Sequence, residues 1–153
     1  MIETSDDLGD FVAYLEDELN WEFNVDSFED RLKLQKYLYL GEIFDLNHSY
    51  DYNLYNYGPY SPKLADDYYN LSTKADASRA PDFDDTEFSD FVEGKDAKWL
   101  EVAATTYRFM KKYDSYYDAE EYRENVVHRV CEVKDTTPGL VRSTFDELTS
   151  VVP

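Results

Sequence analysis

The sequence has 153 residues, a formal net charge of −19 and an aromatic content of 17%. This length suits a single domain, which would bury roughly 70% of the surface of its unfolded chain. So high an aromatic content excludes a disordered acidic chain, because such chains lack the apolar area for a core. No apolar run approaches the roughly 20 residues of a membrane-spanning helix, so we expect none.

The N-terminal stretch and the cysteine content indicate the compartment. Residues 1–7 are acidic and lack the basic region that begins a secretory signal. Cys131 is the single cysteine, which excludes an internal disulfide and a zinc site built from several thiolates. We therefore expect a soluble cytoplasmic domain.

The acidity of the chain has three possible origins. A cytoplasm of high salt would screen the self-repulsion, because the Debye length falls to about 3 Å at 1 M salt. The excess of Asp (20) over Glu (14) agrees with such salt adaptation, whereas nine Lys against six Arg agree less well. Mimicry of nucleic acid or binding of a basic partner would also account for the charge, and so would ordinary variation. We favour salt adaptation.

Six segments carry apolar residues at helical spacing, and several of them follow a helix-start signal. Ser5 and Ser27 are candidate N-caps of the first two helices, and Ser61 followed by Pro62 is a typical start of the third. Asp30 adds a variant of the capping box to the second helix. The expected helices cover residues 6–20, 28–45, 62–72, 96–113, 119–134 and 138 onward.

The segments between these helices have their own signals. The tyrosine-rich segment 49–57 is expected to be extended or irregular rather than a long strand. Residues 58–60, Gly-Pro-Tyr, are expected to turn the chain, because Gly allows unusual φ values and Pro bars continuation of a strand ladder. Residues 73–85 are interpreted as a mobile polar loop. Residues 87–93 fit either a short strand or a helical turn.

These elements predict one domain over residues 1–153. We expect a mainly α fold, a compact bundle of about six helices with room for a small strand pair or wing.

Residue patterns typical of catalysis or metal binding are weak. His128 and Cys131 lie three residues apart on one expected helix, but a small buried thiol beside a surface histidine is the favoured interpretation. His48 is interpreted as a local capping residue. An acidic cluster lacks the EF-hand spacing, and no glycine-rich phosphate loop is present. The residues of this acidic cluster are Asp82, Asp84, Asp85 and Glu87. From these weak patterns we expect no cofactor, no metal and no enzyme activity.

Crowded tyrosines are the most distinctive feature of the sequence. Aromatic rings with a polar tip are favoured at recognition surfaces. Covering the edge of the core would explain the same residues, and for the tyrosines alone it is the favoured interpretation. They are Tyr50, Tyr52, Tyr55, Tyr57 and Tyr60.

A nucleic-acid interface would need a basic footprint. Arg31, Lys33 and Lys36 form one group of cations, and Arg123 and Arg129 form another. The first two of these side chains would also suit cations that extend from the core edge to solvent. Lys111 and Lys112 are a further concentrated pair, which we leave unassigned.

Two motifs in fixed order resemble a known family pattern. A helix that contains Leu34-Gln35-Lys36 precedes the turn Tyr57-Gly-Pro-Tyr-Ser61, and a helix with Leu64-Ala65 follows. This order is similar to that of YwgA-like proteins and of the related Panacea (SocA-like) domains. The match covers about residues 31–71, with weaker support from residues 99–105 and 132–134.

The resemblance implies a mainly helical domain without established catalysis, and Panacea domains are associated with neutralisation of toxins by protein contact. We therefore expect a non-enzymatic, antitoxin-like protein-interaction module whose partner is another protein such as a toxin. The alternative is a DNA-binding transcription regulator with a winged-helix-like element, which would use the cations named above. The expected partner-binding residues are Tyr55, Tyr57, Gly58, Pro59, Tyr60 and Ser61.

Salt adaptation predicts that dilution loosens the fold. Transfer from molar potassium chloride into low salt should lower the melting temperature, because the carboxylates then repel one another over a longer Debye length. Thermal unfolding followed by circular dichroism measures this shift. A melting temperature that does not depend on salt would contradict the hypothesis.

Overall fold

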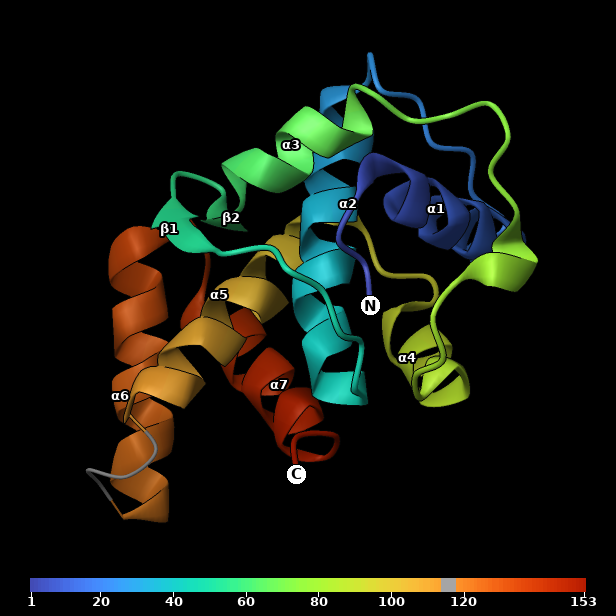
Figure 1. Ribbon diagram of the computed structural model, residues 1–153. Coiled ribbons are helices and arrows are strands. Elements are labelled where there is room, and N and C mark those ends of the chain that lie inside the picture. The colour runs from blue at the N-terminus through green and yellow to red at the C-terminus, as the bar shows by residue number, and fades with distance from the viewer. Residues whose placement is uncertain (114–117) are drawn as a thin grey trace.

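The computed structural model describes residues 1–113 and 118–153. This part of the chain forms seven α-helices and one two-stranded sheet, which confirms the mainly α class and the small strand pair (Figure 1). Two short 3₁₀ helices complete the secondary structure. The elements are α1 (Ser5–Leu19), α2 (Phe28–Gly41), η1 (Glu42–Phe44), β1 (Asn53–Tyr55), β2 (Gly58–Tyr60), α3 (Pro62–Tyr68), η2 (Ala77–Arg79), α4 (Asp85–Val92), α5 (Ala97–Tyr113), α6 (Ala119–Val133) and α7 (Pro138–Thr149).

Side-chain caps begin the first three helices. Ser27 and Ser61 act as N-caps as expected, because each hydroxyl accepts a hydrogen bond from the backbone N–H three residues on. The expected cap Ser5 is wrong by one residue, since Thr4 caps α1. The hydroxyl of Thr4 accepts from the Asp7 N–H, and the Asp7 carboxylate accepts from the Thr4 N–H, which makes a capping box.

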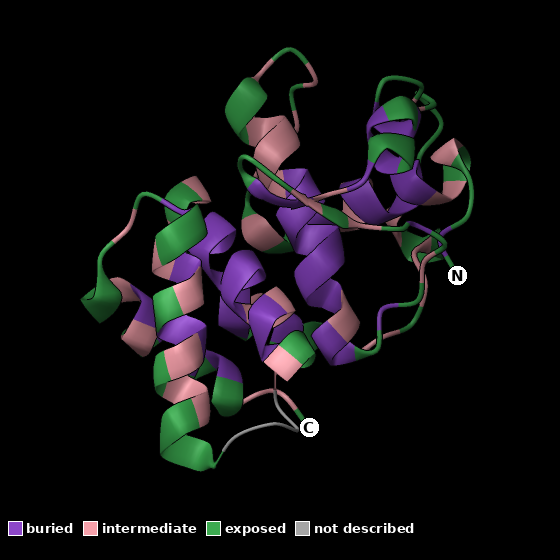
Figure 2. Ribbon diagram, turned by 90° about the vertical axis from the view of Figure 1, so that its left-hand side faces the viewer, coloured by how far each residue is buried: buried purple, intermediate pink, exposed green. Residues whose placement is uncertain are grey.

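The core is built around α2 and α5. Residues 34–41 of α2 are buried without a break, and so are residues 100–106 of α5 (Figure 2). Helix α5 packs against α2, and it also packs against α6 and α7. The C-terminal half of α2 is thus covered on all sides and has no polar stripe.

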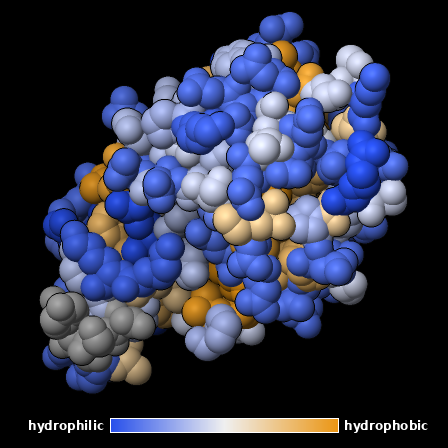
Figure 3. All heavy atoms as spheres, viewed as in Figure 1, coloured by the Kyte–Doolittle hydropathy of each residue, from blue (hydrophilic) through white to orange (hydrophobic). Residues whose placement is uncertain are grey.

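The view in Figure 3 shows a face dominated by hydrophilic residues, with small apolar patches between them. Within the described ranges, no helix is both long enough and apolar enough to cross a membrane.

Two element ends differ from the expectation, and one open alternative is resolved. Helix α2 ends at Gly41 because the chain turns there through η1 to a positive φ at Asp45, and Leu46 packs where a side chain on Gly41 would lie. Helix α3 ends at Tyr68, four residues early. The ambiguous segment 87–93 is mostly helical and belongs to α4, whose buried Phe and Val residues face the core.

The polar segment 73–85 contains η2, which packs against α1. The Asp10 carboxylate accepts hydrogen bonds from the Asp76 N–H at 2.9 Å and from the Arg79 guanidinium at 3.3 Å. These bonds attach the middle of the segment to α1. The mobility of the segment stays a prediction.

Strands β1 and β2 form an antiparallel hairpin with Asn56 and Tyr57 at its turn. The expected turn at residues 58–60 is therefore misplaced, since these residues form β2. Pro59 is compatible with the ladder because it pairs with Leu54 at the position where no N–H is needed. From such a position the Pro59 carbonyl faces away from β1, toward the helices.

Gly58 is the residue on which the hairpin geometry depends. Its φ is +91°, and a Cβ built on it would lie 2.7 Å from Thr105 Oγ1 on α5. Gly58→Ala should therefore destabilise the protein by about 2 kcal/mol or more, through backbone strain and overpacking. Denaturant unfolding of the variant measures this loss.

Gly139→Ala is the matched control, because Gly139 has open space around its Cα and an ordinary φ at the start of α7. This change should be neutral or stabilising by up to about 1 kcal/mol. Equal stability of the two variants would refute the role given to Gly58.

Candidate functional site

Gln35 on α2 binds the backbone at the end of the hairpin. Its side-chain oxygen accepts from the Ser61 N–H at 2.9 Å, and its side-chain nitrogen donates to the Ser61 carbonyl at 2.9 Å. All of these groups are buried, so the bonds are protected from competition by water. Gln35 therefore sets the distance between α2 and the start of α3.

Lys36, the next residue on α2, binds the hairpin at Pro59, two residues before Ser61. Its side chain has 0% exposure, and Nζ donates to the Pro59 carbonyl at 2.7 Å. Burial lowers the pKa of Lys36 to about 7, the Glu101 carboxylate opposes this shift, and the Lys134 ammonium adds to it.

Two further cations hold the hairpin from α5 and from the end of α6. Lys134 donates to the Asn56 carbonyl at 3.2 Å and forms a buried ion pair with Glu101 at 3.2 Å. Arg108 on α5 donates to the Tyr52 carbonyl at 3.3 Å. We call Gln35, Lys36, Arg108 and Lys134 the hairpin clamp.

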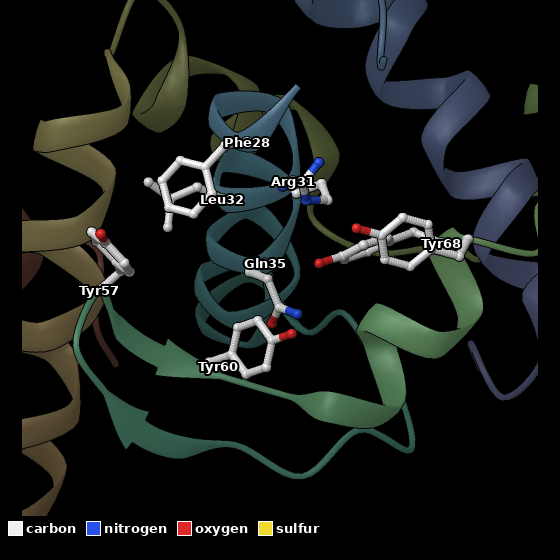
Figure 4. Close-up of a pocket in the computed structure, with 8 residues that line it drawn as sticks. Phe28, Arg31, Leu32, Gln35, Tyr57, Tyr60 and Tyr68 are labelled. Atoms are coloured by element: carbon white, nitrogen blue, oxygen red, sulfur yellow. The ribbon is translucent and has the colours of Figure 1, made fainter. Parts of the chain in front are cut away.

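A cavity of about 270 Å³ opens between α2, the hairpin and α3, and Figure 4 shows aromatic side chains from all three around it. Phe28 and Tyr57 meet edge to face at 5.1 Å between ring centroids on one side. We call this cavity the aromatic groove. Its lining residues are Phe28, Arg31, Leu32, Gln35, Tyr57, Tyr60, Tyr68 and Tyr69.

Arg31 is the cation of the aromatic groove. Its guanidinium lies 5.9 Å from the centroid of the Phe28 ring and 6.0 Å from that of Tyr69. One nitrogen, Nη1, donates to the Val25 carbonyl at 2.7 Å. No carboxylate of the described residues lies within 4 Å of Arg31, so it keeps N–H donors for another group.

The six expected partner-binding residues divide into two sets. Tyr55 and Tyr57 are exposed and Tyr60 is half-buried, so these three reach the surface. Gly58, Pro59 and Ser61 are buried, so the prediction that these three contact a partner needs correction. They shape the hairpin and carry the groups that the clamp binds.

Three residues of this surface were missed from the sequence. Phe28 and Tyr69 are 52% and 58% exposed in the aromatic groove, and Val133 is 43% exposed beside Tyr55. Phe28 and Val133 continue the apolar spacing of their helices, a pattern that by itself favours a place in the core. No local signal distinguishes an apolar residue at the end of a stripe from one inside it.

The five candidate nucleic-acid residues do not form one surface of free cations. Lys36 is fully buried, which is a second correction, because a buried ammonium reaches no phosphate. Lys33 pairs with Glu29 on the same helix. Arg123 pairs with Asp146 and Glu124, and Arg129 with Glu132, so their charges are already neutralised. Arg31 is the one cation of the five that is neither buried nor paired with a carboxylate of the described residues.

The weaker candidates have local roles. His128 pairs with Glu132 at 2.7 Å on the surface of α6, and the half-buried Cys131 packs against the core. His48 accepts from the Tyr50 N–H through Nδ1 at 3.1 Å, which agrees with a local role. Among residues 1–113 and 118–153, no group of three His, Cys, Asp or Glu side chains is arranged to hold a metal ion.

No family model, curated protein or solved structure matches this chain. The resemblance to YwgA-like and Panacea domains therefore stays a prediction.

The buried Lys36 predicts a pH dependence of stability. Because its pKa falls from 10.5 in the unfolded chain to about 7 in the folded chain, the unfolded chain binds more protons between these values. The contribution of Lys36 should thus become more favourable as the pH rises from 7 toward 10.5, and be constant below 7.

Lys36→Met removes this dependence. As the pH rises from 7 toward 10.5, the unfolding free energy of the wild type should increase relative to that of the variant by up to about 1.4 kcal/mol per pH unit. Urea unfolding in constant molar potassium chloride across the window measures it. Parallel pH curves for the two proteins would show that Lys36 does not titrate as described.

Proposed function

We propose that the protein is a non-enzymatic interaction module that binds another protein through the aromatic groove and the adjoining Tyr55. One observation carries this proposal. Six large apolar side chains are exposed among the described residues, and five of them lie at the groove or next to it. Apolar area gathered at one place is typical of a contact surface. The five are Phe28, Tyr55, Tyr57, Tyr69 and Val133.

The hairpin clamp supports the proposal by making this surface rigid. Tyr57 lies at the turn of a hairpin whose backbone is bound by the buried Gln35 and Lys36 at the end of β2 and by the buried Lys134 at the turn. A side chain held in place before binding loses little conformational entropy on binding. Rigid exposed aromatics are the residue type that most often dominates the energy of protein contacts.

The groove also indicates what the partner contributes. Its walls are aromatic, so an apolar side chain fits the cavity, and Arg31 offers donors to a carbonyl or carboxylate beside it. The net charge of −19 favours approach of a partner with a basic surface. A toxin neutralised by contact is the kind of partner that the resemblance to Panacea domains implies.

The alternative function, a DNA-binding regulator, has less support. Of its five expected contact residues, Arg31 alone is neither buried nor paired with a described carboxylate, and its neighbours are aromatic. A gel shift across salt concentrations would favour this alternative if specific binding showed a steep salt slope.

Photo-crosslinking tests the proposal. A photoreactive phenylalanine in place of Tyr57 should capture the partner in the host cell, and the partner is then purified for binding measurements. Tyr57→Ala and Tyr55→Ala should each weaken its affinity by about tenfold or more, as expected for an aromatic contact residue.

Tyr57→Phe is the matched control, because it keeps the ring that meets Phe28 and removes only the hydroxyl. It should bind within about threefold of the wild type, since the apolar area is unchanged. Unchanged affinity of both alanine variants, with their folds intact by circular dichroism, would exclude this surface as the contact site.

A further inference from the structure

A second cavity, of about 490 Å³, lies between α2, β1 and the C-terminal half of α5. It shares no lining residue with the aromatic groove. This size falls within the range of small-molecule pockets, about 300 to 1,000 Å³. Its lining residues are Tyr39, Leu54, Arg108, Phe109, Lys111 and Lys112.

Among the described residues, the three cations of this cavity have no carboxylate within 4 Å. The chain has 34 acidic residues for 15 Lys and Arg, and eight of these 15 have a carboxylate within 4 Å. Arg108, Lys111 and Lys112 have none in the ranges that the structure describes. In so acidic a chain, three such cations within five residues are a concentration of free positive charge.

Aromatic rings lie close to the two lysines, Lys111 and Lys112, and a backbone carbonyl holds Arg108. Lys111 Nζ lies 4.6 Å from the centroid of the Tyr39 ring and 4.7 Å from that of Tyr107. Arg108 uses Nη1 for the Tyr52 carbonyl, so other guanidinium donors stay available. The ammonium groups are thereby positioned without being neutralised.

Within the described residues, Glu42 and the C-terminal end of α5 oppose an anion here. Glu42 contributes to the field at Lys111, but it lies more than 4 Å away and faces His48 at 3.4 Å. The C-terminal end of α5 carries about half a negative charge. Three full positive charges exceed both, and salt screens the more distant carboxylates.

We propose that this cavity binds a small molecule that carries a phosphate group. An Arg fork and two Lys ammonium groups are the donors that phosphate oxygens prefer. The rings of Tyr39 and Phe109, with Leu54, would contact the apolar part of the ligand. The proposal does not rest on the protein-binding function, since this cavity shares no lining residue with the aromatic groove, although Leu54 also lines the surface beside Tyr55 and Arg108 also belongs to the hairpin clamp.

Calorimetric titration with inorganic phosphate and with adenosine monophosphate tests this site, against chloride at constant ionic strength. Both should bind saturably at one site, and the nucleotide should bind more tightly because of its organic part. Lys112→Gln and Arg108→Gln should weaken binding by about tenfold or more each. Lys112 is exposed, so its variant tests the site even if loss of Arg108 disturbs the fold.

Lys74→Gln is the control, because it removes the same charge from an exposed position outside the cavity. It should bind within about twofold of the wild type, since the distant charge is screened. Absence of saturable binding, or equal weakening by the control, would overturn the proposal. Duplex DNA that binds with a steep salt slope while neither small probe competes would also overturn it, in favour of a nucleic-acid surface.

Discussion

The hydrogen bonds from Gln35 and Lys36 to the backbone at Ser61 and Pro59 are the contacts on which the rest of the surface depends. A hairpin with three-residue strands has too few ladder bonds to be stable by itself. Here it persists because buried side chains from α2 satisfy its outward-facing carbonyls. The helices build the core, and the core then supports the hairpin.

The same contacts explain in physical terms why the two motifs occur together with the weaker matching segments, residues 99–105 and 132–134. Gln35 and Lys36 belong to the helix motif, and they bind the Gly-Pro-Tyr-Ser motif directly. Glu101 and Lys134, from the two weaker segments, form the ion pair that supports the hairpin turn. All four segments therefore meet at one place, and their order along the chain reflects one packing arrangement.

This arrangement separates residues that build the surface from residues that contact a partner. Gly58 is buried and has a positive φ, and the buried Ser61 donates its N–H to Gln35. The fold therefore fixes which residues can stand at these two positions. Tyr57 and Phe28 touch each other on one side of the groove and are half exposed, so part of each ring stays available to a partner. A rigid backbone that presents exposed aromatic side chains is well suited to recognition, because little conformational entropy is lost on binding.

The sequence by itself determined the helical class, the caps at Ser27 and Ser61 and the cluster of tyrosines, because these depend on spacing and on neighbours a few residues away. Tertiary structure decided which residues of that cluster are exposed and where the hairpin turns. It also buried Lys36 while leaving Lys33 on the surface, although both are cations on one helix. Burial depends on which distant elements pack together, and for Lys36 these are β2 and α5, which local periodicity does not reveal.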